Sequence, residues 1–404
     1  MIFDSLKLTR PKLLSITSQV PWPLNSGGHL RTYHLQHALG RNLDVELVYP
    51  RDRRQSPALP DEANFQFSGF DVSPRSLVSE ACRIGLAQVK RCPYSMYFRH
   101  HRKQLKRQWS RLVSTSRPDI VWLDHVDSYL YLPSLEHSAK VVIDLHNIYS
   151  LILRRLAKES RGALRRRALN VEAARMEQVE RQVCQTVDAV IAVSDEEGDY
   201  FRQLGARQVH VAPNGVDCDG VKMVGRRPIG EHPQILFVGA MDWHPNVSSA
   251  ISLATEIFPQ VQNRWPHAQL NLVGKSPVDS VKQLGQLPGV NVTGTVPEIA
   301  PYLESASLFA VPLDSGGGTR LKILEAFAAG VPVVSTAVGA EGIEALDGVH
   351  LRLASRDCMA ETMLDLLNHP DQGSSLANAA RTLVEARYDW RAIGERTFEF
   401  LQSA

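Results

Sequence analysis

The amino-acid sequence predicts an α/β protein with two doubly wound domains, each a parallel sheet covered by helices. The chain has 404 residues, 44% of them hydrophobic and 22% charged, which is an ordinary composition and enough for two cores. Short apolar runs alternate with helical segments in both halves. Between them lies a stretch rich in Gly, Pro and charge. We therefore expect domains at 1–217 and 234–387, a linker at 218–233, a final segment at 388–404, and a crevice between the two sheets.

The first domain is predicted to contain six strands and two candidate binding loops. The strands are Lys12–Thr17, Asp44–Tyr49, Asp119–Leu123, Val141–Leu145, Ala189–Val193 and Val209–Ala212. Gly27 and Gly28 open a helix past the carboxyl end of the first strand, where ligands bind in open sheets, although a structural turn explains them equally well. His146 and Asn147 follow the strand K-V-V-I-D-L-H-N at the same edge, and a lone His is more often structural.

The second domain is predicted to begin at Ile235 and to repeat the same alternation. Its later strands are Asn271–Val273, Val290–Thr293, Leu308–Val311, Val331–Ser335 and His350–Leu353.

The segment from Asp314 to Thr336 carries the strongest functional signal. Its three glycines, Gly316 to Gly318, lead from a strand into a helix, so bare N–H groups converge at a helix N-terminus and favour an anion. Arg320 and Lys322 lie in the first turn, where each cation costs about a few tenths of a kcal/mol without an anion. Glu325 interrupts an apolar run and needs hydrogen-bond donors such as sugar hydroxyls. The pattern indicates a ribose-containing nucleotide; a glycine-rich turn with a solvated Glu remains the alternative.

The string G-G-G-T-R-L-K-I-L-E-A-F-A-A-G-V-P-V-V-S-T resembles the donor-site signature of the group-1 (family 4) retaining glycosyltransferases, and most closely their exopolysaccharide-associated branch. The resemblance implies a GT-B fold of two Rossmann-like domains facing across a cleft. It implies that the donor diphosphate and ribose are held by residues of this segment: Gly317, Gly318, Thr319, Arg320, Leu321, Lys322 and Glu325.

Three further roles follow from the same resemblance. The glycine loop at Gly27 and Gly28 would contact donor or acceptor, and His146 would face the transferred sugar. The backbone at Thr295 and Val296 would bind the nucleobase. The segment from Tyr388 would form a closing helix that crosses back onto the first domain.

The chain departs from the family pattern at two places. Gly317 stands where the family's first Glu of E-x7-E is usual, which leaves the transferred sugar open. The first loop of the second domain has Asp242, Trp243 and His244 in place of a basic residue. Arg320 and Lys322 would then have to neutralise the phosphate charge. We therefore expect Arg320, Lys322 and His146 to be the catalytic residues, with His146 holding the sugar rather than transferring protons.

The resemblance thus implies a metal-independent hexosyltransferase, without a cofactor, that uses a nucleotide-diphospho-sugar and a lipid-linked or polysaccharide acceptor. A nucleotide-sugar epimerase of the same shape and a non-catalytic nucleotide-sugar-binding protein are the alternatives. The string Asp217, Cys218, Asp219 matches a D-x-D metal signature but lies in the expected linker, so no metal site is predicted.

Charge and cysteine usage suggest where the protein works. The net charge of +2 and the lack of a recognition motif argue against nucleic acid. The segment Lys90–Arg117 carries nine Lys/Arg, no acidic residue and several aromatic residues. This pattern suits an anionic membrane surface or a solvated helix face equally. The segment Arg154–Arg167 adds seven more Lys/Arg. Five scattered cysteines and no long apolar stretch indicate a cytoplasmic protein, with peripheral binding to the inner membrane face left open.

Overall fold

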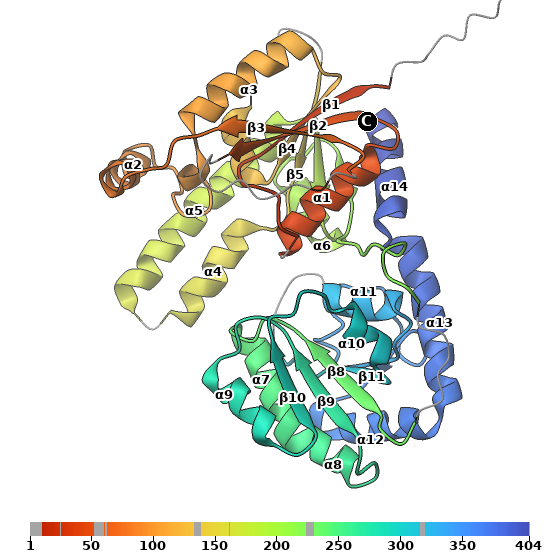
Figure 1. Ribbon diagram of the computed structural model, residues 1–404. Helices are drawn as coiled ribbons and strands as arrows, with labels where there is room; N and C mark the ends of the chain where they lie inside the picture. The colour runs from red at the N-terminus through yellow and green to blue at the C-terminus, as the bar shows by residue number, and fades with distance from the viewer. Residues whose placement is uncertain are drawn as a thin grey trace, which may run out of the picture. The chain divides into compact units, whose positions relative to one another are not determined.

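The computed structural model describes residues 10–403 apart from 25, 52–59, 61–62, 133–138, 161, 224–229 and 316–319. The chain divides into two compact units. The N-terminal unit comprises residues 1–213 and 393–404, and the C-terminal unit comprises residues 214–392. Each contains one sheet in which all strand pairs are parallel (Figure 1). The expected α/β class with two doubly wound sheets is confirmed.

The N-terminal sheet has the order β3-β2-β1-β4-β5-β6-β7. Its strands are β1 (Lys12–Thr17), β2 (Asp44–Arg51), β3 (Gln66–Asp71), β4 (Ile120–Asp124), β5 (Lys140–Asp144), β6 (Ala189–Ala192) and β7 (Val209–Val211). Its helices are α1 (Gly27–Leu39), α2 (Leu77–Val89), α3 (Lys103–Ser116), α4 (Tyr149–Glu159), α5 (Ala163–Thr186) and α6 (Asp195–Gln203), with 3-10 turns η1 (Phe98–His100) and η2 (Val126–Tyr131). The helices α4 and α5 lie side by side (Figure 1).

The six predicted strands of this unit are confirmed to within two residues, and β3 was missed. Buried parallel strands have continuous apolar sequences, which is why β1, β4 and β5 could be located. The strand β3 has the sequence Q-F-S-G-F-D, pairs only with β2 and is half-exposed along its length. An edge strand needs no apolar run, so its sequence gave no comparable signal.

The C-terminal sheet has the order β10-β9-β8-β11-β12-β13. The strands are β8 (Gln234–Val238), β9 (Gln269–Val273), β10 (Val290–Gly294), β11 (Leu308–Val311), β12 (Val333–Ser335) and β13 (Arg352–Leu353). The helices are α7 (His244–Ser252), α8 (Phe258–Gln262), α9 (Asp279–Lys282), α10 (Ala300–Ser305), α11 (Leu321–Ala328), α12 (Arg356–Asn368) and α13 (Pro370–Arg387), with a π-helical turn η3 (Leu253–Ile257) and a 3-10 turn η4 (Gln283–Gln286).

Alternate residues of β8 face two separate cores. Ile235 and Phe237 pack with α8 and α12 on one side of the sheet, whereas Leu236 packs with Phe309 and the apolar face of α11 on the other. Because successive side chains of a strand point to opposite faces, a strand covered on both sides must be apolar throughout. The helix α11 is thereby fixed against the sheet, with its first turn at the sheet's carboxyl edge.

The last helix, α14 (Trp390–Ser403), begins in the C-terminal unit, and from Ile393 on it belongs to the N-terminal unit. Gly394 lies against Ala38 of α1 so closely that a Cβ at position 394 would be 2.4 Å from the Ala38 Cβ. The Lys140 ammonium donates to the Leu401 carbonyl at 2.6 Å, and His210 stacks on Phe400. A side chain at position 394 would push this helix away from α1.

The aromatic residues of Lys90–Arg117 lie mainly in the core. Tyr97, Phe98 and Trp109 are buried, and Trp109 shares one face of α3 with Leu105 and Val113 at helical spacing. The opposite face exposes Lys103, Lys106, Arg107 and Arg111. Tyr97, Phe98 and Trp109 are therefore used in the core of this unit, whereas the choice between a membrane surface and a solvated face for the cations stays open. The cationic face remains accessible. Among the described residues, no helix is both long and apolar enough to cross a bilayer.

Candidate active site

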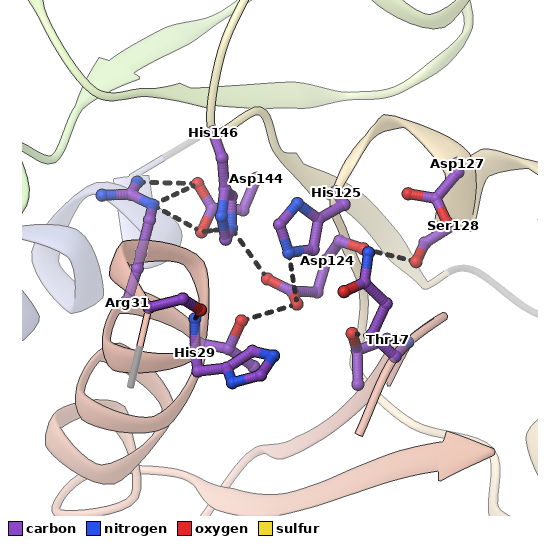
Figure 2. Close-up of polar contacts among 12 residues, drawn as sticks. Thr17, His29, Arg31, Asp124, His125, Asp127, Ser128, Asp144 and His146 are labelled. Atoms are coloured by element: carbon purple, nitrogen blue, oxygen red, sulfur yellow. Dashed lines mark hydrogen bonds and ion pairs between the residues drawn. The ribbon is translucent and has the colours of Figure 1, made fainter. Parts of the chain in front are cut away.

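Polar side chains gather at the carboxyl edge of the N-terminal sheet. Asp124 ends β4, Asp144 ends β5, and each is followed within two residues by a histidine, His125 or His146 (Figure 2). Because β4 and β5 are neighbours in the sheet, the two strand ends bring these four groups together. The helix α1, which begins at the expected Gly27, adds Arg31 and Thr32.

Two cationic side chains contact the carboxylates: Arg31 contacts Asp144, and His146 contacts both Asp124 and Asp144. The Arg31 guanidinium donates to Asp144 through Nε at 2.9 Å and Nη2 at 2.7 Å, and both side chains are 1% exposed. His146 Nε2 lies 3.0 Å from Asp124 Oδ1 and 3.2 Å from Asp144 Oδ2. The Thr32 hydroxyl donates to Asp124 Oδ2 at 2.8 Å. The groups form one connected network, which we call the His146 cluster: Arg31, Thr32, Asp124, His125, Asp144 and His146.

His146 is held in its charged form. Burial opposes that charge, but Asp144 and Asp124 outweigh burial and raise the pKa of His146 to about 9. The pKa of His125 is lowered to about 3 by burial and by the neighbouring His146, so His125 is neutral. Two carboxylates thus face one guanidinium and one imidazolium, and the buried charges balance.

One imidazolium N–H of this cluster has no acceptor in the part of the chain that the structure describes. His146 Nδ1 is buried and makes no hydrogen bond among the described residues. Gly28 lies beside it: a Cβ there would be 3.8 Å from His146 Nδ1 and 3.4 Å from His125 Cε1. A buried N–H without a partner is unfavourable, so the site fits a ligand oxygen next to Gly28. The sequence-predicted Gly28 and His146 are therefore brought together, and Gly27 precedes them as the first residue of α1.

The backbone at His125 is strained. Its φ of 69° and ψ of 156° fall in a region that only glycine adopts readily, at a cost of about 1–3 kcal/mol for another residue. Such strain is concentrated at functional sites. Sequence reasoning missed His125, Asp124 and Arg31. The signal that could have found two of them is the shared ending of neighbouring strands, W-L-D-H and I-D-L-H.

Asp124, His125 and His146 also offer ligand atoms within 4.8 Å of one another, close enough for one metal ion. The ion pairs argue against that use. Both carboxylates already have cationic partners, and a protonated imidazole has no lone pair to give a metal. The cluster as built is suited to binding neutral hydroxyls or an anion rather than a cation.

The second candidate region is the first turn of α11 in the C-terminal unit. The expected Gly317, Gly318 and Thr319 lie outside the described residues. Arg320 stands at the N-cap position, is 4% exposed, and donates through Nη2 to the Val338 carbonyl at 3.0 Å. Leu321 packs partly on the core. Thr295 is exposed and Val296 half-buried, just after Gly294, the last residue of β10, whose φ is 69°.

Lys322 is a half-buried cation at the carboxyl edge of this sheet. Its ammonium donates to Asn246 Oδ1 at 2.9 Å and lies 4.6 Å from the centre of the Phe237 ring. Burial, and then repulsion by Arg320, lower the pKa of Lys322 to about 7. Burial raises the pKa of Glu325 to about 7, although Lys322 opposes this. Neither group has an opposite charge close enough to hold it fully ionised.

Asn246 is a residue that sequence reasoning missed. It lies in the first turn of α7, just after Asp242, Trp243 and His244, which are all exposed and of which His244 is the first residue of the helix. Its side chain donates to the Ala240 carbonyl at 2.9 Å and covers Gly239, where a Cβ would be 2.6 Å from Asn246 Nδ2. Asn246, which contacts Lys322, is neutral. It therefore holds the Lys322 ammonium in place without neutralising its charge.

The D-x-D string does not form a cluster of carboxylates. Cys218 is buried in the core of the C-terminal unit, Asp217 accepts from the Gly220 backbone at 3.0 Å, and Asp219 lies 3.9 Å from Arg391.

The two doubly wound units define a protein of the GT-B fold class, and solved structures share that fold over almost the whole chain. Sucrose-phosphate synthase from Thermosynechococcus elongatus superposes with a TM-score of 0.68 at 16% identity, over 98% of this chain and 99% of that one. The Anabaena protein HepE, solved in complex with UDP and glucose, superposes with a TM-score of 0.65 at 17% identity, over 98% and 100%. At such identities the likeness shows the fold alone.

Family models identify both halves of the chain. Residues 26–219 match the model described as Glycosyltransferase Family 4, and residues 232–369 match Glycosyl transferases group 1. The chain belongs to the group 1 glycosyltransferases. A mannosyltransferase of Corynebacterium glutamicum that is GDP-mannose-dependent and acts on a monoacylated phosphatidylinositol monomannoside is 32% identical over 165 residues, 36% of this chain and 42% of that protein. The chain spans about half the length of the curated relatives it matches.

Proposed function

We propose that the chain is a retaining glycosyltransferase that moves a hexosyl group from a nucleotide-diphospho-sugar to a lipid-linked or polysaccharide acceptor. The observation that supports this most directly is Lys322, a half-buried cation fixed by neutral Asn246. A partly desolvated ammonium that makes no ion pair with a carboxylate among the described residues is unfavourable, and a diphosphate would restore its charge. The adjacent Arg320 and the glycine-led start of α11 would add to the same anion site. The exopolysaccharide-associated branch stays a prediction.

In this proposal the charged groups stabilise the leaving group. As the bond between the sugar C1 and the diphosphate oxygen breaks, the electron pair stays on that oxygen, and Arg320 and Lys322 stabilise the growing negative charge. The acceptor hydroxyl attacks C1, and its proton passes to the leaving diphosphate. Glu325 would accept hydrogen bonds from the ribose hydroxyls. The chain's own cations do this work, so the proposal includes no metal and no cofactor.

His146 would bind the transferred sugar and would not act as a base. With a pKa raised to about 9 it is protonated at neutral pH, so it can donate through Nδ1 but cannot accept a proton. Gly28 would leave room for the sugar beside the ring.

The proposed function is tested with a thermal-shift panel of nucleotide sugars that includes UDP-glucose and GDP-mannose, followed by an acceptor screen with the best stabiliser. A transferase is expected to be stabilised by one donor and to turn it over with an acceptor. The His146→Gln variant is expected to bind that donor but to lose about 10²–10³ in kcat, the usual cost of removing one positioned donor. His267→Gln, at an exposed histidine, is the matched control. Full activity in His146→Gln would exclude the sugar-binding role.

We further propose that the N-terminal unit binds an anionic membrane through α3. Its exposed face carries Lys103, Lys106, Arg107 and Arg111 around a hollow of about 430 Å³. The neighbouring sequence supplies an apolar complement, since α2 exposes Val78, Ile84, Leu86 and Val89. Cations and exposed aliphatic side chains together suit the headgroup region of a bilayer.

Reversing these four charges to Glu is expected to weaken binding to phosphatidylglycerol vesicles by more than about a hundredfold, because each cation near the surface contributes about 1 kcal/mol. Cosedimentation measures the effect. The control reverses four exposed cations elsewhere, Arg202, Arg207, Arg264 and Lys282. Equal loss in both variants would indicate a bulk charge effect, and retention in the α3 variant would remove the membrane proposal.

A further inference from the structure

A basic hollow opens in the N-terminal unit beside the His146 cluster. It measures about 690 Å³, and the residues that line it include Ser18, Arg75, Glu80, Arg99, His100 and Arg102. Ser18 follows the carboxyl end of β1, the same edge of the sheet as Asp124 and Asp144. His100 Nδ1 lies 3.9 Å from Asp127 Oδ2, and Asp127 belongs to η2, the turn directly after His125. The contact between His100 and Asp127 therefore connects the hollow to the turn that follows His125 of the cluster.

The charges around this hollow do not cancel. Glu80 lies 3.3 Å from Arg75 and 4.0 Å from Arg83, so it already serves two guanidinium groups. Neither Arg99 nor Arg102 forms an ion pair with any described residue. The pKa of Arg75 is lowered by burial and then by repulsion from Arg102 and Arg83. Burial raises the pKa of Asp127 to about 7, so this carboxyl offsets little of the charge. An excess of positive charge is left facing the hollow.

The hollow also presents neutral hydrogen-bonding groups. The Ser18 hydroxyl is 7% exposed and, although it is near Asp127, it has no partner at hydrogen-bond distance among the described residues. Ser76 lines the hollow as the N-cap of α2, accepting from the Ser79 backbone at 3.2 Å, so the positive end of that helix is at the same place. Arginines, a hydroxyl and a helix N-terminus together are the groups that bind phosphate.

We infer that this hollow binds a phosphate group carried by the acceptor. The inference rests on the proposed function, in which α11 of the C-terminal unit takes the donor's own diphosphate and the His146 cluster takes the transferred sugar. A phosphate held by Arg99 and Arg102 would bring the acceptor to the carboxyl edge of the N-terminal sheet, next to that cluster. The acceptor class is then a phosphate-bearing molecule, either a lipid with a phosphate headgroup or a soluble sugar phosphate.

The test titrates inorganic pyrophosphate into the full chain by calorimetry, with Arg320→Ala and Lys322→Ala present so that α11 does not compete. Adding Arg99→Gln and Arg102→Gln is expected to weaken binding by at least about tenfold, since two charge-assisted contacts are lost. Arg207→Gln, at an exposed arginine outside the hollow, is the matched control and should change nothing. Arg75 is left intact because its guanidinium donates to the backbone carbonyls of Arg99 and His101 and so holds the loop.

Two further arms separate the possible results. In the chain with α11 intact, Arg99→Gln and Arg102→Gln should leave the affinity for UDP and GDP unchanged. If the donor proposal is wrong, no variant will bind either nucleotide, and this result does not depend on the hollow. Phosphatidylcholine vesicles doped with phosphatidic acid show which kind of molecule carries the phosphate. If the Arg99→Gln, Arg102→Gln variant loses binding to both the vesicles and pyrophosphate, the phosphate belongs to a lipid headgroup. If it loses binding to pyrophosphate alone, the phosphate belongs to a soluble molecule. Pyrophosphate binding that is absent in the parent, or equal in parent and variant, overturns the inference.

Discussion

Replacing Arg31 by methionine is expected to destabilise the N-terminal unit by about 3–5 kcal/mol, because it leaves two buried carboxylates, Asp124 and Asp144, with the His146 imidazolium as their shared cation. Arg31 and Asp144 are each 1% exposed and joined by three hydrogen bonds from the guanidinium. The loss would also remove the Arg31 contact to the Ala212 carbonyl at 2.7 Å. Urea denaturation, followed by tryptophan fluorescence, measures the change; Trp109 and Trp122 are both buried in this unit.

The matched control is Arg51→Met. Arg51 pairs with Asp71 at 2.8 Å, a distance similar to that of the buried pair, but its side chain is 41% exposed. An exposed pair contributes no more than about 1 kcal/mol, so the control should unfold almost as the parent does. If Arg31→Met cost no more than the control, the view of the His146 cluster as a balanced set of buried charges would be wrong.

The Arg320→Ala, Lys322→Ala variant is expected to bind nucleoside diphosphate about 10²–10⁴ times more weakly than the parent. Each cation would make a charge-assisted contact with phosphate, and such contacts contribute about 1.5–3 kcal/mol. Calorimetry with UDP and GDP measures the affinity. Arg264→Ala with Lys282→Ala removes two exposed cations from the same unit and serves as the control. Unchanged affinity in the α11 variant would end the donor-site assignment.

The same variant gives a pH signature. The pKa of Lys322 is lowered to about 7 in the free protein, and an anion binds better when the ammonium is charged. The parent should therefore bind diphosphate best below pH 7, lose affinity as the pH rises through that value, and take up protons on binding above it. The variant lacks Lys322 but keeps Glu325, whose pKa is also raised to about 7, so it should lose the part of this dependence that comes from the ammonium.

The strands and the glycine-led helix could be predicted from the sequence because each is defined by its own neighbours in the chain. Buried strands such as β4 and β8 are continuous apolar runs, and the cations at Arg320 and Lys322 stand out against the rule for a helix N-terminus. The edge strand β3 has neither feature, and its place is set by pairing with β2.

The partners of the site residues could not be predicted, because they are distant in the sequence. Asp144 lies 113 positions after Arg31, and Lys322 lies 76 positions after Asn246. Which charges balance, and hence that His146 is protonated, depends on contacts that only the folded sheet creates. The side of α3 that carries Trp109 is a similar case. Its apolar stripe could pack against a membrane or against a protein core, and the sequence does not distinguish the two.

The path of α14 bears on how the molecule is made. Residues from Ile393 on cover Ala38, with Gly394 in steric contact, yet they are synthesised after the entire C-terminal unit. In a chain that leaves the ribosome from its N-terminus first, all strands of the second sheet are therefore translated before α1 can receive its cover.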